Sequence, residues 1–132
     1  MNALLIQTEG FALAAEVEIN GHRLIVMDQF SPPGGKRGAG VLQDVRLSAD
    51  EFAPLTWEAV FSGNPNAEKR LTHVTGWTYL GYGQVVQVDP MIVDFGFLQL
   101  EVGPRTHDRR CVGEFVKIKI DRLSLSSSDN ES

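Results

Sequence analysis

The sequence predicts an all-β protein, and two observations lead to this fold class. Apolar residues recur at every second position in several segments, which is the period of a half-buried strand. The chain also contains 13 glycines, which suits a fold with many turns. Strand candidates separated by turn residues favour a small antiparallel β-barrel. The glycine-broken strand in the second half suits a Greek-key barrel of the oligonucleotide/oligosaccharide-binding (OB) type.

The first predicted elements are two strands joined by a tight turn. Residues 11–20 alternate, with one face formed by Phe11, Leu13, Ala15, Val17 and Ile19. Asn20 and Gly21 predict a type I′ hairpin turn, because both central residues of that turn need positive φ. The return strand, 22–30, is more continuously apolar, and we expect it to be central in its sheet.

The middle of the chain holds shorter elements. Residues 41–47 predict a short strand, and the alternation in 55–61 predicts another. Ser48 stands three residues before a glutamate, which is the spacing of a capping box. Pro54 limits any helix there to about one turn. The sequence therefore predicts at most one short helical turn, near 48–53.

The second half is dominated by extended segments. Residues 69–89 form a long strand region broken by Gly76, Gly81 and Gly83, where the sheet is expected to bend. Strands follow over 97–102 and 114–125. In the last of these, the apolar positions change phase at Asp121-Arg122, which predicts a strand end or a β-bulge.

Length and composition indicate one soluble domain. The 132 residues predict a single β-barrel domain over 1–125 and a disordered polar tail over 126–132. A formal net charge of -5 disfavours nucleic acid on average. One cysteine permits no internal disulfide, and no segment is typical of a signal peptide or a membrane span. We expect a cytoplasmic protein that does not bind membranes.

Residues 30–41, FSPPGGKRGAGV, form a glycine-rich loop that lacks the features of a phosphate-binding loop. A P-loop needs Ser or Thr after its lysine, but Lys36 is followed by Arg37, and no long helix follows. The dinucleotide-binding spacing of glycines also fails, because Gln43 stands at the third position. The sequence therefore predicts a connection between strands with two adjacent cations at its tip.

Two residue pairs are candidates for catalysis. Asp89 and Asp94 could act as acid and base, and His107 with Cys111 could form a nucleophile and its base. Turn formation explains the aspartates, and packing explains the cysteine. The sequence leaves open whether either pair forms a site. It predicts no metal site and no cofactor, because zinc ligands normally come in two short-spaced pairs.

A cluster of cations carries the nucleic-acid alternative. If the last strand pairs with 97–102, one patch would collect Arg105, Arg109, Arg110, Lys117 and Lys119. Trp77, Tyr79 and Tyr82 could lie on the same barrel. Cations beside aromatic rings are what a single-strand binder needs, for phosphate attraction and base stacking.

The sequence favours a non-catalytic binding or interaction module whose partner is a protein. Its predicted partner-binding residues lie in two loops: Lys36, Arg37, Arg105, His107, Arg109 and Arg110. The alternatives are a single-stranded nucleic-acid-binding OB-like domain and a small hydrolytic enzyme. The sequence leaves open whether the two loops meet in space and whether the chain forms a homodimer.

Overall fold

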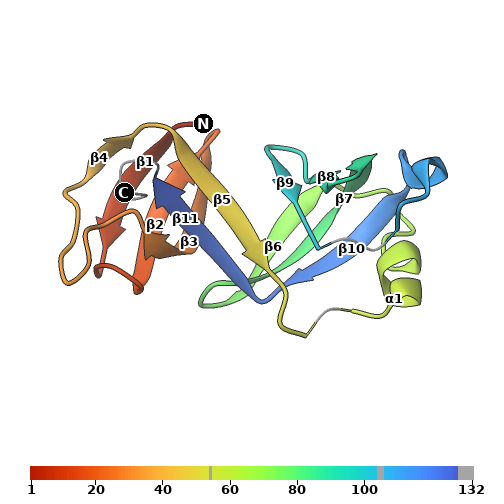
Figure 1. The fold of residues 1–132 in the computed structure, drawn as a ribbon, viewed down its shortest axis with the longest axis horizontal. Coiled ribbons are helices and arrows are strands. Elements are labelled where there is room, and N and C mark those ends of the chain that lie inside the picture. The colour runs from red at the N-terminus through yellow and green to blue at the C-terminus, as the bar shows by residue number, and fades with distance from the viewer. Residues whose placement is uncertain (54, 104–105, 128–132) are drawn as a thin grey trace.

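The computed structural model describes residues 1–53, 55–103 and 106–127 of the chain. Within them the predicted all-β class is confirmed, with eleven strands, one short α-helix and one 3-10 turn arranged as two sheets (Figure 1). Neither helical segment in these ranges has the length and apolarity needed to cross a membrane.

Sheet A has six strands in the order β4-β1-β2-β3-β11-β5. Its strands are β1 (Ala3–Thr8), β2 (Ala14–Ile19), β3 (His22–Gln29), β4 (Gly40–Leu42), β5 (Val45–Asp50) and β11 (Arg122–Ser127). All neighbours are antiparallel except β3 and β11, which run parallel. β11 also extends two residues past the predicted end of the ordered chain, while residues 128–132 of the predicted tail lie outside the described residues.

Sheet B has five strands, and β7 is its longest. Its strands are β6 (Arg70–Thr75), β7 (Thr78–Val88), β8 (Met91–Asp94), β9 (Gln99–Glu101) and β10 (Phe115–Ile120). β10 pairs with β7 along one side, while β6 and then β8 pair with successive parts of its other side. The helix α1 (Trp57–Ser62) lies next to β10, and the 3-10 turn η1 (Arg109–Cys111) precedes β10 in the chain.

The predicted closed barrel is not found among the described strands, which form two separate sheets. Sheet A curls until its two ends meet at one corner, where the Val45 N–H donates to the Met1 carbonyl at 2.9 Å. The two terminal strands, β4 and β5, do not pair with each other beyond that corner, so the described strands of sheet A do not close into a barrel.

The β2–β3 hairpin confirms the predicted turn, but the preceding strand is shorter than predicted. Asn20 and Gly21 have φ values of 49° and 82°, as a type I′ turn requires. β2 begins at Ala14, so Phe11 and Leu13 lie outside the strand and are exposed. The reason is a turn at Ala12, where φ is 66° and the N–H donates to the Asp28 carbonyl.

Two predictions for the middle of the chain are wrong. Residues 45–50 form strand β5 rather than ending in a helical turn near 48–53, because they pair along β11. The predicted strand at 55–61 is instead α1, whose first turn is capped by the Thr56 hydroxyl accepting from the Ala59 N–H at 3.2 Å. The alternation that suggested a strand places Trp57 and Phe61 four residues apart on one helix face, where their ring centroids lie 4.6 Å apart and the ring planes are tilted by 34°.

The change of phase at Asp121 marks the passage of the chain from one sheet to the other. β10 belongs to sheet B, β11 belongs to sheet A, and Asp121 alone lies between them (Figure 1). The Asp121 N–H donates to the Asp50 carbonyl, while Arg122 is the register partner of Asp50. Of the two predicted outcomes, a strand end or a bulge, the structure shows the strand end, because β10 ends at Ile120 and β11 begins at Arg122.

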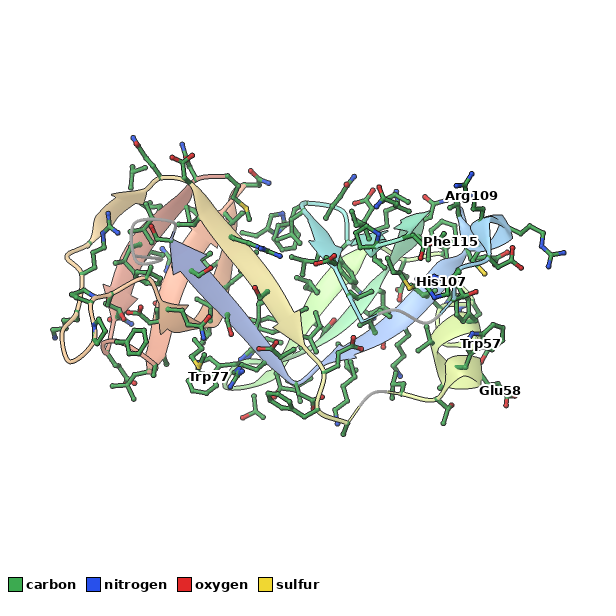
Figure 2. All side chains as sticks on the ribbon, viewed as in Figure 1. Trp57, Glu58, Trp77, His107, Arg109 and Phe115 are labelled. Carbon is green, nitrogen blue, oxygen red and sulfur yellow. The ribbon has the colours of Figure 1, made fainter. Side chains whose placement is uncertain are left out.

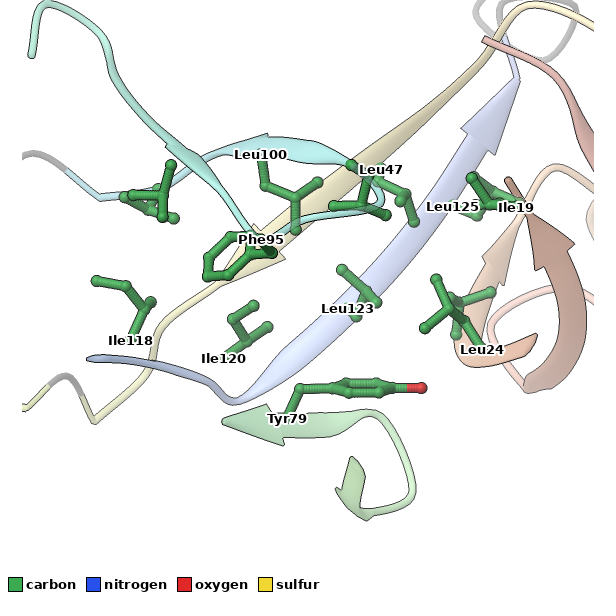
Figure 3. Close-up of a cluster of buried hydrophobic side chains, with 14 of the residues drawn as sticks. Ile19, Leu24, Leu47, Tyr79, Phe95, Leu100, Ile118, Ile120, Leu123 and Leu125 are labelled. Carbon is green, nitrogen blue, oxygen red and sulfur yellow. The ribbon is translucent and has the colours of Figure 1, made fainter. Parts of the chain in front are cut away.

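The Tyr79 side chain fills the gap that opens where β3 and β11 separate. Its hydroxyl donates to the Ile25 carbonyl at 2.9 Å and accepts from the Ile25 N–H at 2.8 Å. These backbone groups belong to the part of β3 that β11 does not reach. Figure 3 shows the ring directed between Leu24 and Leu123, and burial raises the pKa of the hydroxyl.

One cluster of buried side chains joins the two sheets (Figure 3). Leu47 of β5 and Leu123 of β11 lie beside Phe95 and Leu100 of sheet B. Phe95 is fully buried, and it packs where β7 carries Gly81 instead of a larger residue. A Cβ at Gly81 would lie 2.4 Å from Cε1 of Phe95.

We predict that Gly81→Ala destabilises the protein by about 1–3 kcal/mol, because the buried ring cannot move away from the added methyl group. Gly38→Ala is the matched control, since a Cβ there meets no atom within 4 Å. Its effect on the free energy of unfolding should stay within about 0.5 kcal/mol. Urea denaturation of both variants measures this difference, and equal stabilities would contradict the packing argument.

Asp121 predicts an acid-sensitive contribution to stability. Its carboxylate accepts from the Phe52 and Ala53 N–H groups at 2.8 Å and 3.0 Å, and these bonds with nearby Lys119 lower its pKa below the ordinary value of 3.8. A lowered pKa in the folded state stabilises the fold above the ordinary pKa, and this contribution is lost as the pH falls through the folded-state pKa.

We therefore expect Asp121→Asn to lower the free energy of unfolding by about 1–2 kcal/mol at pH 7. The difference from the wild type should shrink as the pH falls below about 4. Asp44→Asn, on an exposed turn, is the control and should change little at either pH. A deficit in Asp121→Asn that is independent of pH would show that the charge does not contribute.

Candidate functional site

The two loops that the sequence singled out lie at opposite ends of the molecule. The glycine-rich loop connects β3 to β4 at the outer end of sheet A, and η1 lies at the far end of sheet B (Figure 1). Figure 2 shows His107 and Arg109 at that second end, which is also the end that carries α1. The predicted residues therefore belong to two separate surfaces, and Arg105 lies outside the described residues.

The glycine-rich loop is held in place by hydrogen bonds within the chain. The Gly35 N–H donates to the Pro32 carbonyl at 2.9 Å, and Gly34 supplies the positive φ of 77° that this turn needs. The Ser31 hydroxyl accepts from the Arg37 N–H at 2.9 Å, and the Gly35 carbonyl accepts from the Phe11 N–H at 3.1 Å. The loop is thus tied both to itself and to the turn before β2.

Asp28 anchors this loop from the core. Its side chain is fully buried, and its carboxyl group accepts from the Phe30 and Ser31 N–H groups at 3.0 Å and 2.8 Å. The hydroxyl groups of Ser31 and Thr8 donate to its other oxygen. One buried acidic side chain therefore fixes the start of the glycine-rich loop against β1.

Exposed apolar side chains lie beside this loop. Phe11 and Leu13 are 39% and 49% exposed, and they line a shallow pocket of about 380 Å³ with one anion, Glu9, and one cation, Lys36. We call the surface formed by Phe11, Leu13, Lys36 and Arg37 the glycine-loop surface. The sequence pattern placed Phe11 and Leu13 in the core, so it missed their exposure; Gly10, which precedes Phe11, was the sequence feature that could have shown the strand had not yet begun.

The cations of the glycine-loop surface have no carboxylate partner. Most Lys and Arg side chains in the described ranges form ion pairs with Asp or Glu. Within these ranges the exceptions are Lys36, Arg37, Arg109 and Lys117. Three of these four are residues that the sequence predicted as partner-binding. In an acidic chain, a cation that has no carboxylate partner and lies on a surface fixed by hydrogen bonds is available to an external anion.

The arginine loop at the other end is more fully neutralised. Arg110 donates from Nε to Oδ1 of Asp108 at 3.0 Å and from Nη2 to Oδ2 at 2.7 Å, and this contact lowers the pKa of Asp108 to about 2. Arg109 lies by a shallow pocket of about 280 Å³, which is also lined by Val86 and Val112. Arg109 is thus the cation of this loop that resembles Lys36 in its surroundings.

The structure rearranges the two predicted catalytic pairs. His107 Nδ1 lies 2.5 Å from Asp89 Oδ1, so the histidine of one predicted pair contacts an aspartate of the other predicted pair. The His107 and Asp89 side chains are 83% and 55% exposed. Asp94 instead accepts from the Gly96 N–H and pairs with Lys69, which lower its pKa. Cys111 packs against the core. A histidine–aspartate pair on an open surface is accessible to water, whereas exclusion of water from a closed site strengthens the electrostatic interactions that catalysis uses. The enzyme alternative stays a prediction.

The patch proposed for nucleic acid is also assembled differently. β10 pairs with β7 and not with 97–102, so Lys117 and Lys119 lie opposite Tyr82 and Leu80. Arg70 and Lys117 both approach the Tyr82 ring, at 4.3 Å and 5.9 Å from its centroid.

Most of the remaining patch is already engaged. Arg70 and Lys119 are paired with Glu68 and Asp121, and Tyr79 is buried. Trp77 is half-buried, with a buried indole nitrogen that has no hydrogen-bond partner in the described residues. Among the described cations of the predicted patch, Arg109 and Lys117 are left without a carboxylate partner, but Arg109 belongs to η1 and Lys117 to β10. Tyr82 is the aromatic ring that Lys117 approaches, so the patch offers less than such a binder normally does.

No group of three or more potential metal ligands is found in the described part of the chain. In comparisons with protein-family models, with curated proteins and with solved structures, the chain matches none.

We predict that Asp28→Asn destabilises the protein by about 3 kcal/mol, because the amide leaves donors of the buried cluster without an acceptor. Thr8→Val is the matched control: it removes a hydroxyl that donates to Asp28 and accepts from the Gly10 N–H, leaves the Asp28 acceptors in place, and should cost about 1–2 kcal/mol. Denaturation gives the free energies, and amide hydrogen exchange at Phe30 should accelerate in Asp28→Asn. Unchanged exchange at Phe30 would show that Asp28 does not anchor the loop.

Proposed function

We propose that this chain is a non-catalytic interaction module that binds an acidic segment of a protein partner at the glycine-loop surface. The observation that carries the proposal is the pair of adjacent cations, Lys36 and Arg37, neither of which has a carboxylate partner among the described residues. Lys36 lines one pocket with Phe11 and Leu13, which are exposed although they are large and apolar, and Arg37 follows Lys36 in the loop. An apolar contact flanked by free charge is the usual composition of a protein-binding patch.

The loop that carries these cations supports the proposal. Its backbone is fixed before any partner arrives, because loop N–H groups donate to the Asp28 carboxylate and the Ser31 hydroxyl, and the Gly35 N–H donates to the Pro32 carbonyl. A surface that is ordered in advance loses less conformational entropy on binding, so a small contact area can still give useful affinity. Arg109 with Val86 and Val112 offers a similar but smaller combination at the other end, and we retain the arginine loop as a second predicted contact.

The nucleic-acid alternative rested on an OB-like barrel and on a basic patch. A closed OB-like barrel remains a prediction for this chain, and a net charge of -5 opposes phosphate binding over most of the surface. A protein partner fits the glycine-loop surface better, because two cations beside an exposed phenylalanine and leucine match a segment that carries both acidic and apolar side chains.

The proposal is tested by purifying the tagged wild-type protein from its own host at low expression and recording its native mass spectrum. We expect a second polypeptide of defined mass. The double variant Lys36→Glu, Arg37→Glu should reduce the affinity of the purified partner by about tenfold or more, because it reverses both charges. Lys117→Glu, at the other unpaired lysine, is the matched control and should retain the partner.

Equal affinity in the double variant and the wild type would contradict the proposed surface. A heterogeneous nucleotide mass that disappears with added salt would contradict the protein partner and support the nucleic-acid alternative.

A further inference from the structure

Two strand edges face one groove between the sheets. β5 is the terminal strand of sheet A, and β9 is the terminal strand of sheet B. A pocket of about 540 Å³ lies between them and is lined from both sides. Its volume falls within the range of ligand-binding sites, roughly 300–1,000 Å³. In Figure 3, Leu47 of β5 and Leu100 of β9 lie beside each other, so apolar side chains from both strands meet beneath this region.

The backbone of β5 presents unpaired groups to this groove. Backbone groups of an antiparallel strand point alternately to its two sides. The Asp50 carbonyl accepts from the Asp121 N–H on the β11 side, and the Val45 N–H donates to Met1 on the other side. The N–H and C=O groups of Leu47 and Ala49 therefore point away from β11. In the described ranges no hydrogen bond reaches them, because β5 pairs only with β11.

The same argument applies to β9 from the opposite wall. The Val102 N–H donates to the Met91 carbonyl on the β8 side at 2.9 Å. The Gly103 N–H points the other way and donates to the Glu51 carboxylate at 2.8 Å. Alternation then directs the backbone groups of Gln99 and Glu101 into the groove. The bond from Gly103 to Glu51 shows that an N–H group following β9 can donate to an acceptor on the β5 side of the groove.

The other edges of the two sheets are protected in ways that β5 is not. β4 has three residues, and β6 has a register shift between His73 and Thr75. Beside β10 lies α1, and the Asn64 side chain donates to the Val116 carbonyl. Short edges, bulges and covering helices all prevent strand addition. β5 has six residues, no proline and no register shift, so it is the edge best suited to an added strand.

We infer that β5 binds an extended segment of a partner protein as an additional strand, with β9 forming the opposite wall of the groove. Backbone hydrogen bonds to Leu47 and Ala49 would supply affinity, as in other cases of strand addition. This site is separate from the glycine-loop surface, so each can fail without the other.

The charges of the groove specify the chemistry of that segment. The charged side chains lining it are Arg46, Asp50 and Glu101. Arg122 pairs with Asp50 at 3.0 Å, so Glu101 is the lining carboxylate that a cation of the segment can reach. The Arg46–Glu101 pair spans 3.7 Å, and its side chains are 73% and 51% exposed, so it is a weak contact that a ligand can replace. The segment that fits best is extended and carries a lysine or arginine opposite Glu101.

The test is selection from a phage-displayed library of random short peptides on the wild-type protein, with the Ala49→Pro variant as the counter-selecting surface. Proline removes the N–H that points into the groove and leaves the ladder to β11 intact. Ala49→Val keeps the N–H and is the matched control. Denaturation of both variants establishes that each is folded.

We expect selected peptides to contain a basic residue in an extended apolar context. A synthetic copy should bind the wild type and Ala49→Val with similar affinity and bind Ala49→Pro at least about tenfold more weakly, because a backbone hydrogen bond is lost and its partner stays desolvated. The same peptide, N-methylated at alternate residues on the pairing side, should lose binding to the wild type. This second probe serves if Ala49→Pro does not fold.

Three results would overturn the inference. One is a library that yields no peptide distinguishing the wild type from Ala49→Pro. Another is full binding of the N-methylated peptide to the wild type, since side chains alone would then explain the affinity. The third is a wild-type dimer, seen by sedimentation, that Ala49→Pro dissociates, because the edge would then belong to a second copy of this chain.

Discussion

The position of every strand depends on one extended segment that serves two sheets. β10 completes one side of sheet B, and β11 enters sheet A between β3 and β5, with Asp121 as the single residue between them. The carboxylate of Asp121 binds two amides of the segment that leaves β5, so the outgoing and returning chains are fixed at one point. The separation that this crossing forces between β3 and β11 is filled by the Tyr79 hydroxyl, which takes over two backbone hydrogen bonds. The angle between the sheets, and hence the groove beside β5, follows from this arrangement.

Much of the strand content could be predicted from the sequence, because side chains on a half-buried strand alternate with a period of two. The hairpin at Asn20-Gly21 and the change of phase at Asp121 were predicted because each depends on local geometry. α1 was not, because Trp57 and Phe61 satisfy both an alternating strand and one face of a helix, and the choice is made by the packing of Val60. β1 was missed because residues 3–6 are all apolar, so its buried and exposed positions do not differ in polarity. The pairing of β10 with β7 is a long-range contact that no local pattern contains.

For the candidate surfaces too, the features that depend on local sequence could be predicted, and the features that depend on long-range contacts could not. The sequence identified Lys36, Arg37 and Arg109 because charged residues in glycine- or arginine-rich loops are visible locally. Their lack of carboxylate partners is visible only in three dimensions, since it depends on which strands bring Asp and Glu close. The groove between β5 and β9 could not be predicted, because it is formed by backbone groups of strands from two sheets. Asp28, which holds the loop, looked like an ordinary strand residue, and its burial at 0% exposure sets it apart.

The place of β11 in sheet A also bears on how the chain folds. β11 follows all the other described strands in the chain, yet it lies between β3 and β5, which come from the first 50 residues. Sheet A therefore has a vacant central position until the rest of the chain has been made. Pairings between residues so far apart in sequence give a high contact order, which slows folding. Until β11 arrives, β3 and β5 expose unpaired edges, and these edges are where a nascent chain would need protection from aggregation.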